Sequence, residues 1–214
     1  DYYGMANLDY LQIATVDGVG NVTKTVLTGQ VANVVNDNGG SSHNSSSTQT
    51  NDGANIIALN NGFVVTSYSN DGYGVQMYNN AGASLNINAP ATYTSSVNPN
   101  SYAIASAEGG FILLWTRNNY QTLDFQRYDS SGNQVGATVS STFTTTTPFI
   151  QGAAVDANGN LAIPVSSGDV YTHSQVMMWN SANSLTGTYN TAYYQTAPIV
   201  TAMYGGGFDL FGND

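Results

Sequence analysis

The feature that most constrains this chain is a short motif that occurs four times: a turn containing Gly or Asn runs directly into an apolar strand. The copies are NNGFVV at Asn60–Val65, EGGFIL at Glu108–Leu113, NGNLAI at Asn158–Ile163 and GGGFDLF at Gly205–Phe211. If Phe63, Phe111, Leu161 and Phe208 are equivalent, the steps between copies are 48, 50 and 47 residues. A period of this length indicates one supersecondary unit repeated along the chain.

A second motif recurs between copies of the first, an aromatic or apolar residue followed by a polar turn and a further strand. It occurs as MYNNAGASL around Tyr78, RYDSSGNQVG around Tyr128, MWNSANSLTG around Trp179 and, more weakly, TVDGVGNVTK around Val16. The sequence therefore begins with the second half of a repeat and finishes with the first half of one. We expect Tyr10–Leu27 to pair with Pro198–Phe211, so that the two half-repeats close a ring.

Each repeat is predicted to contain four short strands. In the first full repeat they cover Ala54–Leu59, Phe63–Tyr68, Gly74–Tyr78 and Ser84–Asn88, separated by turns rich in Gly and Asn. Helical spacing of apolar residues is absent, whereas β-branched and aromatic residues are frequent. Four strands per unit predict an all-β fold, a four-bladed β-propeller closed by the terminal half-repeats. The alternative is an antiparallel β-sandwich, whose strands share this alternation.

The length of the chain is consistent with one folding unit. Its 214 residues contain repeats that run through the middle without a linker, so we expect a single domain spanning residues 1–214. One segment stands apart, 36–53, with the sequence NDNGGSSHNSSSTQTNDG. Because it is rich in Ser, Asn and Gly and poor in apolar residues, it is predicted to be a long flexible surface loop.

The charge balance excludes some classes of partner. The chain has three Lys and Arg residues against thirteen Asp and Glu, a net charge of −10, and it has no Cys. Nucleic acid and anionic membranes are not expected as partners, because both require clustered basic residues. No apolar run approaches the roughly 20 residues of a membrane helix. A polar surface built from neutral hydroxyl and amide groups favours an extracellular protein.

Two long segments of the chain resemble a known kind of repeat. NNGFVVTSYSNDGYGVQMYNNAGASL and EGGFILLWTRNNYQTLDFQRYDSSGNQVGATV are similar to the GGFVVTW…QRYDxxGNxVG repeats of large bacterial secreted and cell-surface proteins of adhesin or haemolysin type. The third copy departs from the pattern, with Leu161 in place of Phe and an added Pro164, and Tyr68 is shifted by one from the position of Trp115. The resemblance implies an extracellular, β-propeller-like protein with an adhesive or matrix role, and no catalytic residues.

Aromatic and amide side chains near the ends of strands form a candidate carbohydrate site. An aromatic ring can stack on the apolar face of a sugar while amides and carboxylates bind its hydroxyl groups. The candidate residues are Tyr73, Tyr120, Asp71, Asn118, Asn119, Asp124 and Trp115. For Trp115 and Trp179, which end apolar strands, packing between units is the alternative interpretation.

Oxygen ligands for calcium occur in four Gly-rich clusters. These are Asn36–Gly40, Asn51–Gly53, Asn70–Gly72 and Asp156–Gly159. Calcium is therefore possible, although turn formation explains the same residues and none of the clusters matches an EF-hand loop. Zinc is not expected, since His43 and His173 are the only histidines.

The sequence contains no catalytic signature. Glu108 and Asp124 are the residues considered for a glycoside hydrolase, and His173 lies near Ser174 and Asp169 without the context of a nucleophile motif. The sequence therefore predicts a non-catalytic extracellular surface, matrix or adhesion protein, bacterial or archaeal, that binds copies of itself, other surface proteins or glycans. The alternative is a lectin-like propeller, and a glycoside hydrolase is a minor alternative.

Overall fold

The computed structural model describes residues 12–16, 19, 21–26, 55–69, 72–89, 102–106, 108–117, 121–142, 148–150, 152–167, 175–190 and 199–211. These residues form an all-β structure, in which every pairing of strands is antiparallel and no helix occurs. In particular, the described part of the chain contains no helix that could span a membrane. The predicted loop at 36–53 lies outside these residues.

Two sheets have the predicted four strands, joined in sequence order by hairpins. The first comprises β3 (Asn55–Leu59), β4 (Gly62–Ser69), β5 (Gly72–Asn79) and β6 (Ser84–Leu85). The second comprises β7 (Tyr102–Ala105), β8 (Phe111–Arg117), β9 (Thr122–Tyr128) and β10 (Gln134–Thr142). Their registers match, because Phe63 lies opposite Tyr78 in the first and Phe111 lies opposite Tyr128 in the second. The two repeat motifs of the sequence are therefore partners across the second and third strands of one sheet.

The third full sheet has five strands, because its inner strand is divided in two. It comprises β11 (Pro148–Ile150), β12 (Ala154–Val155), β13 (Leu161–Ser167), β14 (Gln175–Trp179) and β15 (Leu185–Asn190). β11 pairs with β13 up to Val165, and β12 pairs with it again from Ala162. Pro164 lies in the interval and has no N–H to donate to an inner strand, which accounts for the interruption.

Two hairpins complete the described structure. The N-terminal hairpin comprises β1 (Gln12–Val16) and β2 (Val22–Val26), and the C-terminal hairpin comprises β16 (Ile199–Ala202) and β17 (Phe208–Phe211). Each is a two-stranded sheet of its own. The expected pairing between the two ends of the chain therefore does not occur among the described residues, and these residues do not form a closed ring.

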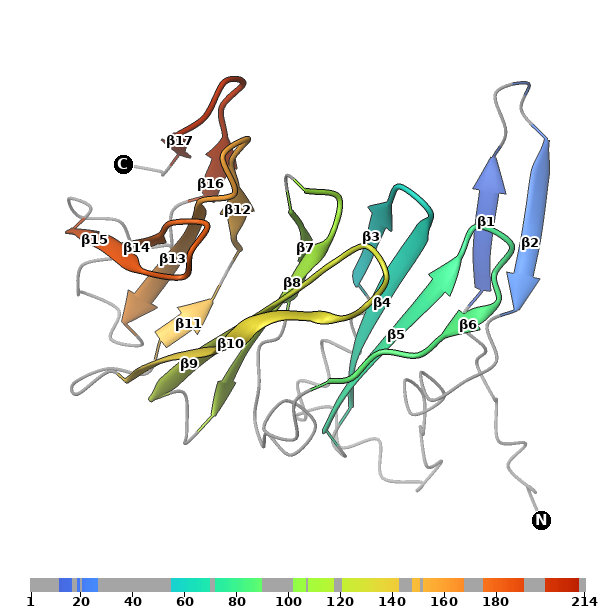
Figure 1. The fold of residues 1–214 in the computed structure, drawn as a ribbon, viewed down its shortest axis with the longest axis horizontal. Helices are drawn as coiled ribbons and strands as arrows, with labels where there is room; N and C mark the ends of the chain where they lie inside the picture. The colour runs from blue at the N-terminus through green and yellow to red at the C-terminus, as the bar shows by residue number, and fades with distance from the viewer. Residues whose placement is uncertain are drawn as a thin grey trace, which may run out of the picture.

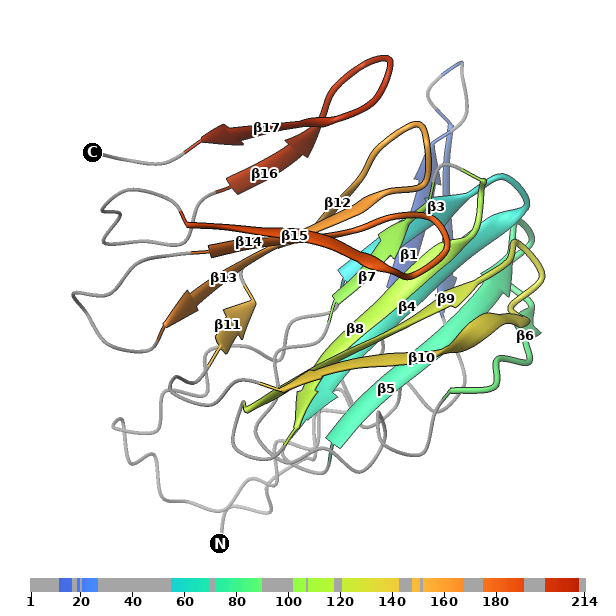
Figure 2. The same ribbon diagram turned by 60° about the vertical axis from the view of Figure 1, so that its left-hand side comes forward.

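The sheets follow one another in a fan (Figures 1 and 2). Their inner strands meet in sequence order, β3 against β7, β7 against β12 and β12 against β16. The C-terminal hairpin packs on sheet β11–β15 and lies at one end of the row, whereas the N-terminal hairpin lies beyond sheet β3–β6 at the other end (Figure 1). Because the two hairpins lie at opposite ends of the row, β1 and β17 do not come close enough to pair, and the described sheets do not close into a ring. A sandwich of two sheets also does not describe the arrangement.

Neighbouring sheets pack face to face through the second strand of each. Since side chains alternate along a strand, Phe111, Leu113 and Trp115 of β8 join a core cluster with Val64 and Met77 of sheet β3–β6. The intervening residues of β8, Ile112 and Leu114, join a second cluster with side chains of sheet β11–β15, among them Ile163 and Trp179. The middle strands are therefore buried on both faces, and each such apolar side chain contributes about 1.5–3 kcal/mol.

Polar contacts also link successive sheets. Arg127 of β9 donates from Nε to Asn183 Oδ1 at 2.6 Å in the turn before β15. Asn183 has φ 65°, the left-handed conformation that glycines take at the equivalent positions 82 and 132. On the other side, the Tyr128 hydroxyl donates to the carbonyl of Asn88 at 3.0 Å. Burial raises the pKa of Tyr128 to about 12, although a side-chain hydrogen bond with Gln134 lowers it.

The turns that precede β4, β8, β13 and β17 lie in a row that we call the ladder of turns, and each turn contacts the next. A Cβ placed on Gly109 would lie 2.7 Å from Asn60 Nδ2, and one placed on Gly159 would lie 3.3 Å from Glu108 Oε1. Asn158 approaches Gly206 in the same way. The side chain at one position of each turn therefore occupies the space that a glycine leaves in the following unit.

Candidate functional site

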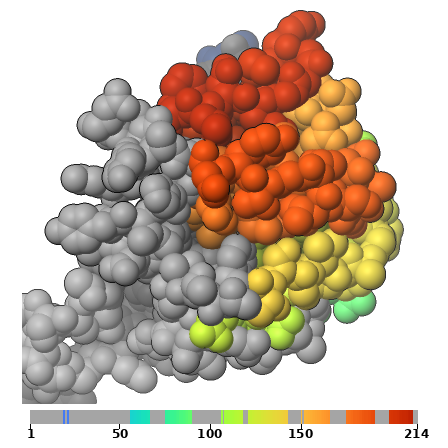
Figure 3. Space-filling model, turned by 90° about the vertical axis from the view of Figure 1, so that its left-hand side faces the viewer, coloured from blue at the N-terminus to red at the C-terminus, as the bar shows by residue number. Residues whose placement is uncertain are grey.

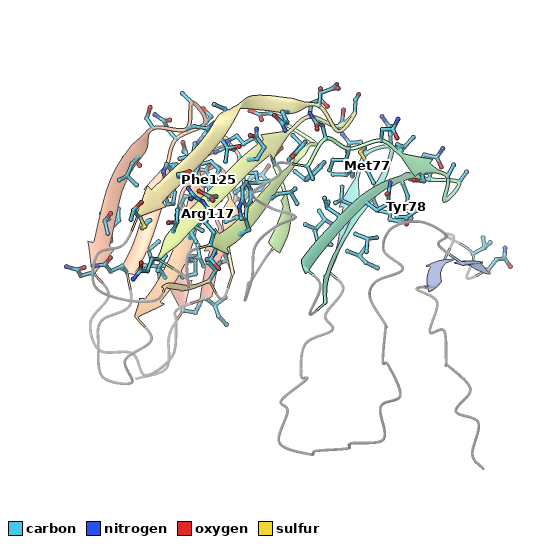
Figure 4. All side chains as sticks on the ribbon, turned by 90° about the horizontal axis from the view of Figure 1, so that it is seen from below. Met77, Tyr78, Arg117 and Phe125 are labelled. Atoms are coloured by element: carbon cyan, nitrogen blue, oxygen red, sulfur yellow. The ribbon has the colours of Figure 1, made fainter. Side chains whose placement is uncertain are left out.

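The structure places two of the predicted carbohydrate-binding residues in the interior. Trp115 is fully buried and packs in the core between sheets β3–β6 and β7–β10. Asp124 is buried and pairs with Arg117, whose Nε lies 2.6 Å from Asp124 Oδ2. Figure 4 labels Arg117 beside Phe125 within this part of the fold. Both side chains therefore serve the packing of sheet β7–β10, which for Trp115 is the alternative interpretation given above.

The other predicted residues belong to two equivalent connections. Tyr73 lies in β5 opposite Tyr68, next to the connection between β4 and β5. Asn118, Asn119 and Tyr120 belong to the connection between β8 and β9, and Asp71 to the connection between β4 and β5. These four residues lie outside the described residues, as does the side chain of Tyr73. The topology places both connections at the same end of neighbouring sheets.

The Asp-Gly cluster at 156–159, one of the four calcium candidates, forms a turn in which the carboxylate already has several donors. Asp156 Oδ1 accepts hydrogen bonds from the backbone N–H groups of Asn158 and Asn160, each at 2.9 Å. Asp129 Oδ1 accepts the same pair of bonds in its own turn, from Ser131 and Asn133. Within the described ranges there is no group of three or more His, Cys, Asp or Glu residues that could hold a metal ion.

The remaining calcium and catalytic candidates are only partly covered. The clusters at 36–40 and 51–53 lie outside the described residues, as do Asn70 and Asp71 of the third cluster. His173, Ser174 and Asp169 are likewise outside them. Glu108 is exposed in the turn before β8, and its negative charge raises the pKa of Arg127, which burial lowers to a larger extent.

The sequence motifs did not point to the most unusual surface of the structure, which lies on the C-terminal hairpin. Cross-strand pairs place Ile199, Thr201, Asp209 and Phe211 on one face of it, which we call the open face. Ile199 is 66% exposed and Phe211 is 55% exposed. Figure 3 shows this hairpin (red) beside the strands of sheet β11–β15 (orange).

The same positions are buried in every full sheet. The repeat aligns Phe211 with Thr66, Leu114 and Pro164, and all three are buried. Asp209 aligns in the same way with Val64, Ile112 and Ala162, each 0% exposed. In each full sheet a following sheet covers these residues, whereas no described residue does so on the open face. The open face thus occupies the position that is a packing surface in the full sheets, with Asp209 where those sheets have Val64, Ile112 and Ala162. In the sequence this hairpin corresponds to the motif GGGFDLF, which predicts a turn followed by a strand and gives no indication of exposure.

The opposite face of the hairpin is held firmly by sheet β11–β15. Val200 is 7% exposed and packs with Ala162 and Val176, with Phe208 against the same cluster. The backbone N–H of Gly207 donates to Asp156 Oδ2 at 2.8 Å. Apolar contact and a charge-assisted hydrogen bond therefore fix the direction in which the open face points.

The Asp156 carboxylate is the electrostatic part of this anchor. Burial raises its pKa, but the N–H donors of Gly207, Asn160 and Asn158 outweigh burial, so that the pKa lies below its ordinary value of 3.8. A folded-state pKa below the unfolded one means that the unfolded chain binds the proton more readily. The contribution to stability is therefore complete above the ordinary pKa and is lost as pH falls through 3.8 toward the folded value.

Replacing Asp156 by Asn should lower the free energy of unfolding by about 1–3 kcal/mol at neutral pH, because an amide Nδ2 would face the N–H of Gly207. Asp129→Asn is the matched control: the Asp129 turn has the same internal bonds, and none of the described residues of another sheet donates to it. Urea unfolding at pH 7 measures both. If both variants lose the same free energy of unfolding, Asp156 does not anchor the hairpin. The same conclusion follows if the stability of Asp156→Asn decreases on acidification as much as that of the unmodified protein.

No family model matches this chain, and no curated protein matches it either.

Proposed function

We propose that this protein is a non-catalytic extracellular surface, matrix or adhesion protein that acts as a binding and assembly module. The observation that carries the proposal is the open face of the C-terminal hairpin, where Ile199 and Phe211 are exposed at positions of a repeated packing surface. Exposed apolar side chains that lie opposite each other, here beside Thr201 and Asp209, are found on surfaces that a partner covers. The low content of charged residues and the resemblance to secreted repeats support an extracellular setting.

We also propose that the full sheets are blades of a β-propeller-like fold. The radial order of the sheets supports this, with inner strands in contact and outer strands apart. In this interpretation the two terminal hairpins are half-blades: β16 and β17 correspond to the two inner strands of a blade, and β1 and β2 to the two outer strands.

The proposed function is tested by retention of the purified protein on the surface and extracellular material of the cells that produce it. The open-face variant, Ile199→Ser with Phe211→Ser, should be retained about tenfold less, because the apolar area that drives association is removed. The matched control is Leu185→Ser with Tyr189→Ser on β15, which removes two side chains of similar exposure, 52% and 54%. Retention equal in all three proteins, or no retention of the unmodified protein, would overturn the proposal.

Carbohydrate binding is a second proposal, supported by the equivalent placement of two polar connections. Asp71 belongs to one, with Tyr73 in the strand that follows it, and Asn118, Asn119 and Tyr120 belong to the other, in neighbouring sheets. Sites on connections at one end of repeated sheets are common in proteins built this way. A glycan array with and without calcium tests it, and absence of any bound glycan in both conditions would exclude it.

A further inference from the structure

We propose that Arg127 and Asn183 form a recognition pair that selects which sheet packs on sheet β7–β10. Arg127 lies on β9 of that sheet, and Asn183 lies in the turn before β15 of sheet β11–β15. The pair favours sheet β11–β15 as the neighbour over the other sheets of the repeat, whether these belong to the same chain or to another copy. It lies within one chain and does not depend on the proposed function.

The apolar contacts between sheets provide little basis for such a selection. Sheet β7–β10 packs on the preceding sheet through a cluster that contains Phe111 and Val64, and on the following sheet through a cluster that contains Ile112 and Ile163. Both clusters consist of large hydrophobic side chains of the same kinds. Hydrophobic attraction is non-directional and depends mainly on area, so one such face accepts another with little preference. A chain of similar sheets therefore needs a further contact that distinguishes one neighbour from another.

Arg127 and Gly136 form a polar socket on sheet β7–β10, and the side chain of Asn183 fills it. The buried guanidinium of Arg127 donates from Nε to Asn183 Oδ1 at 2.6 Å. A Cβ placed on Gly136 would lie 3.4 Å from Asn183 Nδ2, so the amide lies against both residues of the socket. Gly136 has φ 73° and belongs to the stretch of β10 where the register against β9 shifts, between Val135 and Val139.

The side chain of Asn183 is the group that discriminates, because the second bond of Arg127 is made to the backbone. Arg127 Nη2 donates to the carbonyl of Asn180 at 3.3 Å. The equivalent turns share the same internal backbone hydrogen bonds, so each of them offers this carbonyl. The position of Asn183, however, is Gly82 in sheet β3–β6 and Gly132 in sheet β7–β10. A glycine turn seated on the socket leaves Nε without its acceptor, which weakens the contact of a buried charged group by about 10- to 100-fold.

The carboxylate of Asp129 does not replace the missing acceptor in a turn like that of sheet β7–β10. Its Oδ1 accepts hydrogen bonds from the N–H groups of Ser131 and Asn133, and its Oδ2 accepts one from Asn133 Nδ2. Asn180, at the same position of its own turn, uses Oδ1 for the same internal bonds. The bond that Asn180 accepts from Arg127 is made by its backbone carbonyl.

The interface between sheets β3–β6 and β7–β10 has a different pair at the same positions. Met77 (Figure 4) occupies the position of Arg127, and a Cβ placed on Gly132 would lie 3.2 Å from Met77 Sδ. The same Cβ would lie 3.1 Å from the backbone carbonyl oxygen of Asn86, which cannot turn away. A turn with Asn183 in place of Gly132 would therefore be crowded on sheet β3–β6. Each interface thus disfavours the turn that belongs to the other.

Urea unfolding of the full chain tests whether the two residues act as a unit. Asn183→Gly removes the acceptor, and since glycine tolerates the φ of 65° at this position, we expect the folding equilibrium constant to decrease about 10- to 100-fold. Addition of Arg127→Met, which gives the pair found at Met77 and Gly132, should restore this constant to within about threefold, because no charge remains buried. A decrease on Asn183→Gly that is the same with and without Arg127→Met overturns the pair.

Refolding at increasing protein concentration tests the selection itself. Each protein is unfolded in urea, diluted, and compared by sedimentation velocity with its never-unfolded form at the same concentration. The unmodified protein and Asn183→Asp, which keeps an acceptor oxygen, should regain the original species throughout. Arg127→Met with Asn183→Gly should form about tenfold more misassembled species at high concentration, because its sheets then accept neighbours from other copies. If this double variant refolds as completely as the unmodified protein at every concentration, the proposed selection is wrong.

Discussion

Replacing Trp115 by Ala should lower the free energy of unfolding by about 3–5 kcal/mol, one of the two largest effects that we expect for a single substitution. Trp115 is fully buried in the cluster that joins sheets β3–β6 and β7–β10, with Val64 and Met77 on the facing sheet. Removal of the indole leaves a cavity between two rigid sheets, which close over it only in part. Urea unfolding of the full chain measures the loss.

Tyr204→Ala is the control for this prediction, because Tyr204 is fully exposed in the turn between β16 and β17. We expect its effect to stay within about 0.5 kcal/mol. A Trp115→Ala protein as stable as the control would show that the ring is not part of the core. It would also return Trp115 to the candidates for sugar binding.

Replacing Gly110 by Ala should cost about 3 kcal/mol or more, the upper part of the range for overpacking. A Cβ at this position would overlap the backbone carbonyl oxygen of Tyr128, which belongs to the sheet ladder and cannot turn away. Gly62 makes the same close approach to the carbonyl of Tyr78 in the preceding sheet. The expected result is a large decrease in the urea midpoint or a failure to fold, seen by circular dichroism.

Gly152→Ala is the matched control, since a Cβ there meets no atom within 4 Å. Its backbone also lies outside the left-handed region, so Ala should be neutral or stabilise by about 0.4–1 kcal/mol. If Gly110→Ala does not fold, its loss of stability has no measurable midpoint, so Gly62→Ala provides a second measurement at the equivalent position. Small effects in both Gly110 and Gly62 variants would contradict the close approach.

Much of the fold could be predicted from the sequence because its signals are local. Alternating apolar residues and turns rich in Gly and Asn identified the strands of sheet β3–β6 to within a few residues, and the spacing of Phe63 and Phe111 identified the repeat. The divided inner strand opposite Pro164 was not foreseen, although the missing N–H of proline is a signal that could have indicated it. Whether the half-repeats meet depends on the rotation between sheets, which local patterns do not specify.

The candidate site could be predicted less well. An aromatic residue such as Trp115 can lie in a core or in a binding site, and the sequence does not distinguish the two. Trp115 belongs to the core because the neighbouring sheet covers it. The open face was missed for the converse reason: Ile199 and Phe211 have the pattern of buried strand residues, and their exposure comes from the lack of a covering sheet among the described residues.

The ladder of turns has a consequence for how such a chain changes in length. Asn60 occupies the space beside Gly109, Glu108 the space beside Gly159 and Asn158 the space beside Gly206, so each turn depends only on the turns next to it. Duplication or deletion of one whole unit of 47 to 50 residues leaves every remaining contact of this kind with a suitable partner. The gene can therefore lengthen or shorten the protein in whole units without redesigning any junction, provided that the breakpoints recur at the same position of the repeat.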